Sequence, residues 1–300
     1  MVRRSTNSFD GGPLISGRTH VDGVGREIGD YAVVLAVDDA RSDRVLALAS
    51  SLSEYVDAFK IGVPPLLANG VSLVKRLKDA SDKPVIADLK TADIGFRPEG
   101  APEWSGTNRK ILEVAFGGGI DYAICHAIVG TSSMEECIST AHSMGGRVLT
   151  LPFMTGRGAG LFFDHPLDMG HARRWLASLG ADEVLPRLAS LASRKAGEAG
   201  WRTPVVTVSD LIMLLSEHFG ADGYIAPANL PQVMGDYRKV TEKRVFATGI
   251  ARQGGRLADV FRMLGPRSAA LIGHAIHSVA DPVLACRTFV AERDALASGR

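Results

Sequence analysis

The sequence predicts a (β/α)8 barrel, the TIM-barrel form of the α/β class. Short apolar segments alternate with amphipathic segments along the chain, which is typical of a parallel α/β fold. Eight such strand–helix units can be counted, and this is the number that closes a barrel. Lys60 and Lys90 also stand at the C-terminal ends of two apolar segments, the edge where barrel enzymes carry their functional groups.

Each expected strand is a short apolar run that ends in a polar or turn-forming residue. Each expected helix repeats apolar residues every three or four positions, and glycines mark several helix ends. The run Val205–Val208 is a spare strand candidate. We expect strands at residues 31–37, 57–60, 85–90, 122–126, 148–151, 224–226, 244–247 and 269–272. We expect helices at residues 40–51, 64–78, 108–116, 131–144 (capped by Thr131), 209–219, 230–240, 256–264 and 282–297.

The chain of 300 residues fits one barrel domain, which we expect at residues 26–300 after a flexible N-terminal arm at residues 1–25. Two insertions interrupt the strand–helix pattern. The first, at about residues 95–106, contains prolines and aromatic residues, and the second, at about residues 161–208, contains helical pieces. Long loops in compact domains are usually lids, interfaces or disordered segments, although both insertions could equally be surface decoration.

The composition excludes several classes of protein. A net charge of +1 argues against a nucleic-acid-binding surface, although it permits a local phosphate site. The three cysteines lack the spacing of metal ligands and are typical of reduced thiols. No apolar run is long enough to span a membrane, and the N-terminal residues lack the apolar core of a secretory signal. We therefore expect a cytoplasmic protein that binds neither nucleic acid nor membranes.

The segment Val85–Ile94 carries the strongest functional signal. It begins as a buried strand and then places Asp88, Lys90 and Asp93 within six residues. Residues two apart on a strand project from the same face, so Asp88 and Lys90 should lie side by side. With Lys60 from the preceding strand, these residues form a charge-neutral set that can occupy a dry site. The simpler alternative is a structural ion pair, a helix-starting Asp93 and a solvated Lys60.

These residues resemble a known family, orotidine 5′-phosphate decarboxylase of the compact microbial type. The resemblance extends, with interruptions, from about Tyr31 to Ala291. Sugar-phosphate relatives such as hexulose-phosphate synthase share the Asp-x-Lys-x-x-Asp spacing, but they have a Mg²⁺-binding glutamate on the second strand, where this chain has Lys60. The matching residues are Asp38, Lys60, Asp88, Lys90, Asp93, Ile94, Thr107, Asn108, His126, Thr155, Gln253, Gly254 and Gly255.

The resemblance implies decarboxylation of orotidine 5′-phosphate to UMP with no cofactor and no metal ion. Asp88 would disfavour the bound substrate carboxylate, and Lys90 would stabilise and then protonate the carbanion. Lys60 would hold these charges in place and contact the ribose. Asp93 would reach into the active site of a neighbouring subunit, which implies a homodimer. Asp38 would bind a ribose hydroxyl, although from the residues alone it could equally cap the following helix.

The resemblance places the substrate phosphate over the loops after the seventh and eighth strands, where residues 249–255 would offer it backbone N–H groups. The family has an arginine where this chain has His274, and a histidine is mostly uncharged near neutral pH. Arg252 would compensate, although it could equally face solvent. Thr155 stands where the family commonly has a serine against the base, and His126 is more often a packing residue than a catalyst. The expected substrate-binding residues are Asp38, Ile94, Thr107, Thr155, Gly249, Arg252, Gln253, Gly254, Gly273 and His274.

Three alternatives remain open from the sequence. A divergent family member would act on another nucleotide or on a nucleoside, and His274 is the clue to it. A Mg²⁺-dependent sugar-phosphate lyase would need a carboxylate where Lys60 stands. A catalytically idle nucleotide-binding protein would have no evident need for two carboxylates beside Lys90.

Overall fold

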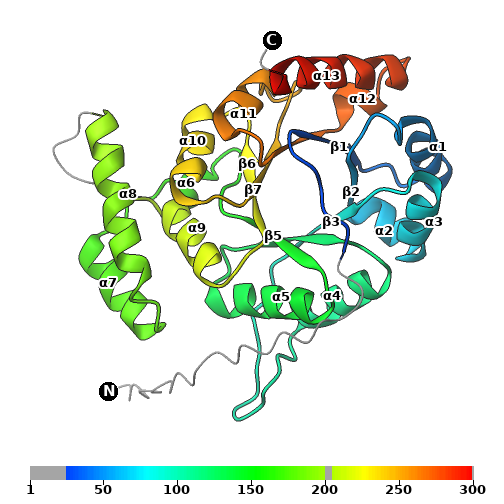
Figure 1. Ribbon diagram of the computed structural model, residues 1–300. Helices are drawn as coiled ribbons and strands as arrows, with labels where there is room; N and C mark the ends of the chain where they lie inside the picture. Colours follow the sequence, from blue (N-terminus) through cyan, green and yellow to red (C-terminus); the bar gives the residue numbers. More distant parts are fainter. Residues whose placement is uncertain (1–24, 200–204, 299–300) are drawn as a thin grey trace.

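Eight parallel strands close into a barrel in the computed structural model of this protein, which describes residues 25–199 and 205–298. Each strand pairs with the next, and the last pairs back with the first, so the expected (β/α)8 fold is confirmed (Figure 1). The strands are β1 (Ala32–Val37), β2 (Ala58–Gly62), β3 (Val85–Thr91), β4 (Tyr122–His126), β5 (Arg147–Leu151), β6 (Gly223–Pro227), β7 (Arg244–Thr248) and β8 (Ser268–Ile272).

Most helices form a ring around the barrel, and two helices of the second insertion stand together to one side of that ring (Figure 1). The helices are α1 (Ser42–Leu52), α2 (Val63–Asn69), α3 (Ser72–Ser81), α4 (Thr107–Gly117), α5 (Thr131–Ser143), α6 (Gly160–Phe163), α7 (Met169–Ser178), α8 (Val184–Ala199), α9 (Val208–His218), α10 (Pro231–Val240), α11 (Leu257–Leu264), α12 (His274–His277) and α13 (Pro282–Ala297).

Three local expectations about these elements are wrong. The helix expected at residues 64–78 is two helices, α2 and α3, because Gly70 adopts a φ of 70° and ends the first. Thr131 is the first residue of α5, and its side chain does not cap the helix. The spare strand candidate Val205–Val208 is not part of the barrel. Its Thr207 instead forms an isolated antiparallel bridge outside the barrel and caps α9.

Side chains alternate between the inside of the barrel and the surrounding helices, as the two-residue period of a strand requires. Along β4, Ile124 belongs to the interior cluster, whereas Cys125 packs against the helices. By the same alternation, an interior-facing position at or near the C-terminal end of each of the first four strands is polar, and in β1 this position directly follows the strand. These positions are occupied by Asp38, Lys60, Asp88 and His126.

The chain enters the barrel at the end opposite to these polar residues. Ile28 is buried and packs in the interior cluster. The Gly25 N–H donates to the Gly145 carbonyl oxygen at 3.1 Å, and Arg147 donates to the Gly25 carbonyl oxygen at 2.6 Å. Gly25, the last residue of the expected N-terminal arm, is therefore bonded to the barrel, and the rest of that expected arm, residues 1–24, lies outside the described residues.

The first insertion projects from the barrel between β3 and α4 (Figure 1). Its two ends are rooted on α5. A Cβ atom at Gly95 would lie 2.1 Å from the Ser132 carbonyl oxygen, and the Gly106 N–H donates to the Glu136 carboxylate at 2.6 Å. These close approaches require glycine at Gly95 and fix where the insertion leaves and rejoins the barrel.

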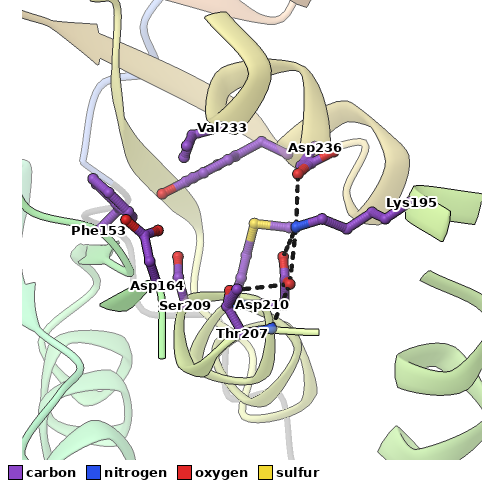
Figure 2. A pocket seen from close by; sticks show the side chains of 10 residues that line it. Phe153, Asp164, Lys195, Thr207, Ser209, Asp210, Val233 and Asp236 are labelled. Atoms are coloured by element: carbon purple, nitrogen blue, oxygen red, sulfur yellow. Dashed lines mark hydrogen bonds and ion pairs between the residues drawn. The ribbon is translucent and has the colours of Figure 1, made fainter. Parts of the chain in front are cut away.

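A partly buried cluster of ion pairs joins the second insertion to the barrel helices. Lys195 on α8 lies 3.0 Å from Asp210 on α9 and 2.9 Å from Asp236 on α10, as Figure 2 shows. Burial alone would lower the pKa of Lys195, but the two carboxylates outweigh it and raise that pKa. The adjoining cavity, lined also by Phe153 and Asp164, measures about 40 Å³, which is room for little more than water.

Gly146 offers a test of the packing around the barrel. A Cβ atom there would lie 2.0 Å from the Phe116 ring, so Gly146→Ala should lower the free energy of unfolding by about 1–3 kcal/mol through overpacking. Gly117→Ala is the matched control, because a Cβ atom at Gly117 meets nothing within 4 Å. Thermal and urea unfolding of both variants provide the measurement. Equal stability of the two variants would contradict this packing.

Candidate active site

A chain of four alternating charges crosses the C-terminal ends of β1, β2 and β3. Lys60 Nζ lies 2.7 Å from Asp88 Oδ2 and 3.8 Å from Asp38 Oδ1. Lys90 Nζ lies 2.5 Å from Asp88 Oδ1. The register of the sheet explains the proximity, because Gly62 at the end of β2 pairs with Asp88 on β3. The structure therefore brings Lys60, Asp88 and Lys90 together and adds Asp38 to them.

The two lysines differ in exposure, although both contact Asp88. The Lys60 side chain is 8% exposed and the Lys90 side chain is 42% exposed. Burial alone would raise the pKa of Asp88, but the neighbouring ammonium groups of Lys60 and Lys90 outweigh it and hold that pKa below its ordinary value. Asp88 is therefore ionised at neutral pH, and Lys90 presents its ammonium group at the mouth of the barrel.

An irregularity in β3 accompanies the position of Lys90. The register with β4 shifts between Ala87 and Thr91, and Lys90 has a φ of 49°. A positive φ is uncommon for a residue with a side chain, and residues held in such conformations cluster at functional sites. Thr91 follows on the outer face, where its Oγ1 lies 3.6 Å from the Cys137 sulfur. The periodicity of the sequence did not reveal this bulge.

Gly62 makes room for Asp38. A Cβ atom at Gly62 would lie 2.1 Å from Asp38 Oδ1, so a larger residue would displace the carboxylate that faces Lys60. The alternative role of Asp38 as a helix cap is wrong. Asp39 instead accepts from the Arg41 N–H at 2.9 Å, immediately before α1.

Asp93 stands apart from the four charges in the single chain. Its side chain is exposed and forms no ion pair with any described residue. The Thr107 hydroxyl and then the Ile94 N–H lower the pKa of Asp93 by hydrogen bonding to it. The Asn108 side chain makes two hydrogen bonds to the Asp93 backbone. It accepts from the Asp93 N–H at 3.1 Å and donates to the Asp93 carbonyl oxygen at 2.8 Å. Glu136, fully buried, accepts from Asn108 Nδ2 at 3.1 Å.

The opposite side of the mouth is formed by the loops after β5, β7 and β8. Thr155 Oγ1 lies 3.4 Å from Gln253 Oε1, so these two expected substrate-binding residues meet. Arg252 is exposed. His274 is exposed at the start of α12, with its ring centre 6.0 Å from that of His277. Gly273 packs closely on β1, because a Cβ atom there would lie 3.0 Å from a backbone oxygen.

The loop after β7 does not offer all the backbone donors expected of it. The Gly254 N–H donates to the Ala251 carbonyl oxygen at 3.0 Å, and the Gly255 N–H donates to the Gly249 carbonyl oxygen at 3.1 Å. Positive φ angles at Gly249, Ala251 and Gly254 let the loop close on itself in this way. The expectation that Gly254 and Gly255 present free N–H groups is therefore corrected.

Sequence reasoning did not include two features of the site. His126 at the end of β4 has its ring stacked on Phe163 of the second insertion, with ring centres 6.3 Å apart. Next to α12, Arg44 lies 3.3 Å from Asp39 and donates to the His277 carbonyl oxygen at 2.9 Å. Neither contact has a signal in the sequence, because each joins segments far apart in the chain.

Within residues 25–199 and 205–298, no cluster of three or more histidine, cysteine, aspartate or glutamate side chains is suited to hold a metal ion. In the same part of the chain, no helix combines the length and apolar character needed to cross a membrane.

Comparison with known proteins identifies relatives of the whole barrel. Residues 31–289 match the family model described as Orotidine 5′-phosphate decarboxylase / HUMPS family. The orotidine 5′-phosphate decarboxylase of Methanosarcina barkeri is 28% identical over 265 residues, which cover 88% of this chain and 95% of the relative. The crystal structure of the Pyrococcus horikoshii OT3 enzyme of that name aligns with a TM-score of 0.62 at 26% identity, covering 87% of this chain and 99% of the other. A 3-hexulose-6-phosphate synthase from Salmonella typhimurium shares the fold, with a TM-score of 0.57 at 19% identity over 89% of this chain and 99% of that one.

The buried position of Lys60 generates a prediction about stability and pH. Because the folded-state pKa of Asp88 is lowered, its ion pairs contribute stability above its ordinary pKa of 3.8, and this contribution is lost as the pH falls through the folded-state value. Lys60→Met should therefore cost about 3 kcal/mol at pH 7, the lower end for breaking a buried pair, and clearly less at pH 3.

Lys75→Met, which removes an exposed lysine on α3, is the control and should be nearly neutral at both pH values. Urea unfolding at pH 7 and pH 3 measures the difference, and a ¹³C NMR titration should show the Asp88 pKa raised in Lys60→Met. A loss of stability that is the same at both pH values would show that Lys60 and Asp88 are not coupled.

Proposed function

The chain belongs to the Orotidine 5′-phosphate decarboxylase / HUMPS family, and from this premise we propose that it decarboxylates orotidine 5′-phosphate to UMP, a step of pyrimidine biosynthesis. It is an enzyme of the decarboxylase type, because it belongs to this family and its relatives are named as decarboxylases. The observation that carries the specific proposal is the unbroken chain of Asp38, Lys60, Asp88 and Lys90 across three strand ends. It supplies charge of both signs where a charged intermediate has to form.

The two central residues of the reaction are Asp88 and Lys90. Breaking the bond between C6 and the carboxylate releases CO₂ and leaves an electron pair on C6 with no carbonyl group to accept it. The ionised Asp88 lies where it would repel the substrate carboxylate and favour its departure. The Lys90 ammonium group, fixed by Asp88, would stabilise the electron pair and then transfer its proton to C6.

Lys60 and Asp38 have a supporting role in this proposal. Lys60 is buried between two carboxylates, so it can hold Asp88 in place but has little freedom to deliver a proton. Lys90 has that freedom, because its side chain is far more exposed. Asp38, exposed at the rim, and Lys60 would contact hydroxyl groups of the ribose. The exposure of the two lysines thus supports assigning proton transfer to Lys90.

Asp93 belongs to the proposal through a homodimer. Its carboxylate and the neighbouring Ile94 side chain are exposed, whereas the Asp93 backbone is fixed by two hydrogen bonds to Asn108. A side chain that is presented outward on a fixed backbone suits a residue that completes the site of a second subunit, together with Ile94 and Thr107. The active unit that we propose is therefore a dimer with shared sites.

Substrate binding on the opposite side of the mouth completes the proposal. Thr155 would contact the base and Gln253 would join it over the substrate, which their mutual contact supports. Arg252, Gly249 and Gln253 from the loop after β7, with Gly273 and His274 after β8, would surround the phosphate. A cytoplasmic location is also proposed, supported by the three buried free cysteines.

A direct assay tests the proposed reaction. The purified protein should consume orotidine 5′-phosphate, followed by ultraviolet absorbance, in EDTA and with no added metal. Lys90→Met should lower kcat/KM by about 10⁴-fold or more, because it removes both the electrostatic partner of the carbanion and its proton donor. Lys75→Met is the control, with the same chemical change on an exposed helix face. No turnover at millimolar substrate would overturn the proposal, and loss of activity in EDTA would favour a metal-dependent lyase.

The proposed binding of the substrate phosphate can be tested separately. Arg252→Ala should lower kcat/KM by about ten- to a hundredfold, since a charge-assisted hydrogen bond contributes about 1.5–3 kcal/mol. His274→Arg should raise kcat/KM on the phosphorylated substrate, because arginine is always charged. Arg256→Ala, at a nearby exposed arginine, should have little effect. If Arg252→Ala is silent and His274→Arg is neutral or harmful, the phosphate lies elsewhere or the natural substrate has none.

A further inference from the structure

His126 occupies an interior position at the mouth that the proposed mechanism does not use. It ends β4, two residues after the interior residue Ile124, so its side chain projects over the inside of the barrel. β4 lies between β3, which carries Lys90, and β5, which leads to Thr155. On the proposed function, the reacting carbon of the pyrimidine lies beside Lys90 and another edge of the ring lies beside Thr155. The ring must therefore pass the end of β4.

The imidazole ring of His126 stacks on an aromatic residue of the second insertion. The ring stacks on Phe163 with an interplanar angle of 23°. Phe163 is 4% exposed and packs in turn against Phe153, with ring centres 5.6 Å apart. Burial, and then the charge of Lys90, lower the pKa of His126, so the ring is neutral at neutral pH.

The two ring nitrogens of His126 have different surroundings. Nδ1 is enclosed and has no hydrogen-bond partner. Nε2 also has no partner among the described residues, but it is not one of the enclosed atoms, so it is accessible to solvent. An enclosed N–H group without an acceptor is rarer and less favourable than an enclosed lone pair. The proton of the neutral ring is therefore on Nε2, and His126 presents an N–H donor to the mouth.

We propose that His126 is a specificity-determining residue that donates from Nε2 to a carbonyl oxygen of the pyrimidine, and that Phe163 positions it for this contact. The inference rests on the proposed function and deepens it. It gives the second insertion a role in recognition of the base, because Phe163 comes from that insertion. It also gives a reason for a histidine at a place where an apolar residue would pack without an unpaired nitrogen.

Two ligands separate this contact from a general effect on the site. UMP has the pyrimidine carbonyl groups, whereas ribose 5-phosphate lacks the base. By isothermal titration calorimetry on the full-length protein, His126→Leu should weaken UMP binding by about tenfold and leave ribose 5-phosphate binding unchanged. His126→Gln, whose amide can place an N–H group near the position of Nε2, should restore UMP affinity to within about threefold.

The role of Phe163 is tested with a neighbouring phenylalanine as control. Phe163→Leu should weaken UMP binding by about two- to fivefold, again with no effect on ribose 5-phosphate, because the imidazole loses its stacking partner. Phe162→Leu changes the adjacent side chain of α6, which is 63% exposed, and should leave both affinities unchanged.

The possible outcomes separate a failure of the proposed function from a failure of the proposed His126 contact. If the unaltered protein neither binds UMP nor consumes orotidine 5′-phosphate, the proposed function fails. If it does both and His126→Leu binds UMP as tightly, or loses affinity for both ligands equally, the inference about His126 is overturned and the proposed function stands. Selective loss of UMP binding in His126→Leu, with recovery in His126→Gln, supports the contact.

Discussion

The burial of the Lys60 ammonium group at the end of β2 is the constraint on which the rest of the site depends. An ammonium group in the interior is tolerated only where carboxylates neutralise it, and Asp88 and Asp38 lie on either side of it. Asp38 can lie there because Gly62 has no side chain, and Asp88 stays ionised because the positive charges of Lys60 and then Lys90 outweigh its burial. Each charge therefore fixes the position of its neighbour, and the barrel supplies the spacing between strands.

The barrel and its charged residues could be predicted because both depend on residues close in sequence or on adjacent strands. A two-residue period places Lys60 and Asp88 on the interior face, and the parallel order of the strands brings them together. Contacts between distant segments left no such pattern. The stacking of Phe163 on His126 joins an irregular insertion to a strand end. In the loop after β7, the sequence predicted backbone N–H donors but not that the Gly254 N–H would bond within the loop.

The residues proposed for the chemistry and those proposed for substrate binding lie on two different sides of the barrel mouth. The charges proposed for the chemistry lie on β1 to β3, where ion pairs hold them. The residues proposed to bind base and phosphate lie on the loops after β5, β7 and β8, where Arg252 and His274 are exposed and free of contact with those charges. On the proposed function, a histidine at position 274 would therefore alter recognition of the phosphate while the ion pairs of Lys60 and Asp88 stay intact. Binding preference can change in this architecture without a change in the reacting groups.

The way in which the first insertion is rooted has a consequence for how this enzyme can change over evolution. Gly95 and Gly106 are both held against α5, and Asn108 holds the Asp93 backbone just before the insertion begins. The two ends of the loop are therefore fixed independently of its length. Doubling the length of such a loop costs only about 0.6 kcal/mol of closure entropy. Segments of new length and composition can be gained or lost here while Asp93 keeps its place, so this position is a low-cost entry point for new recognition elements.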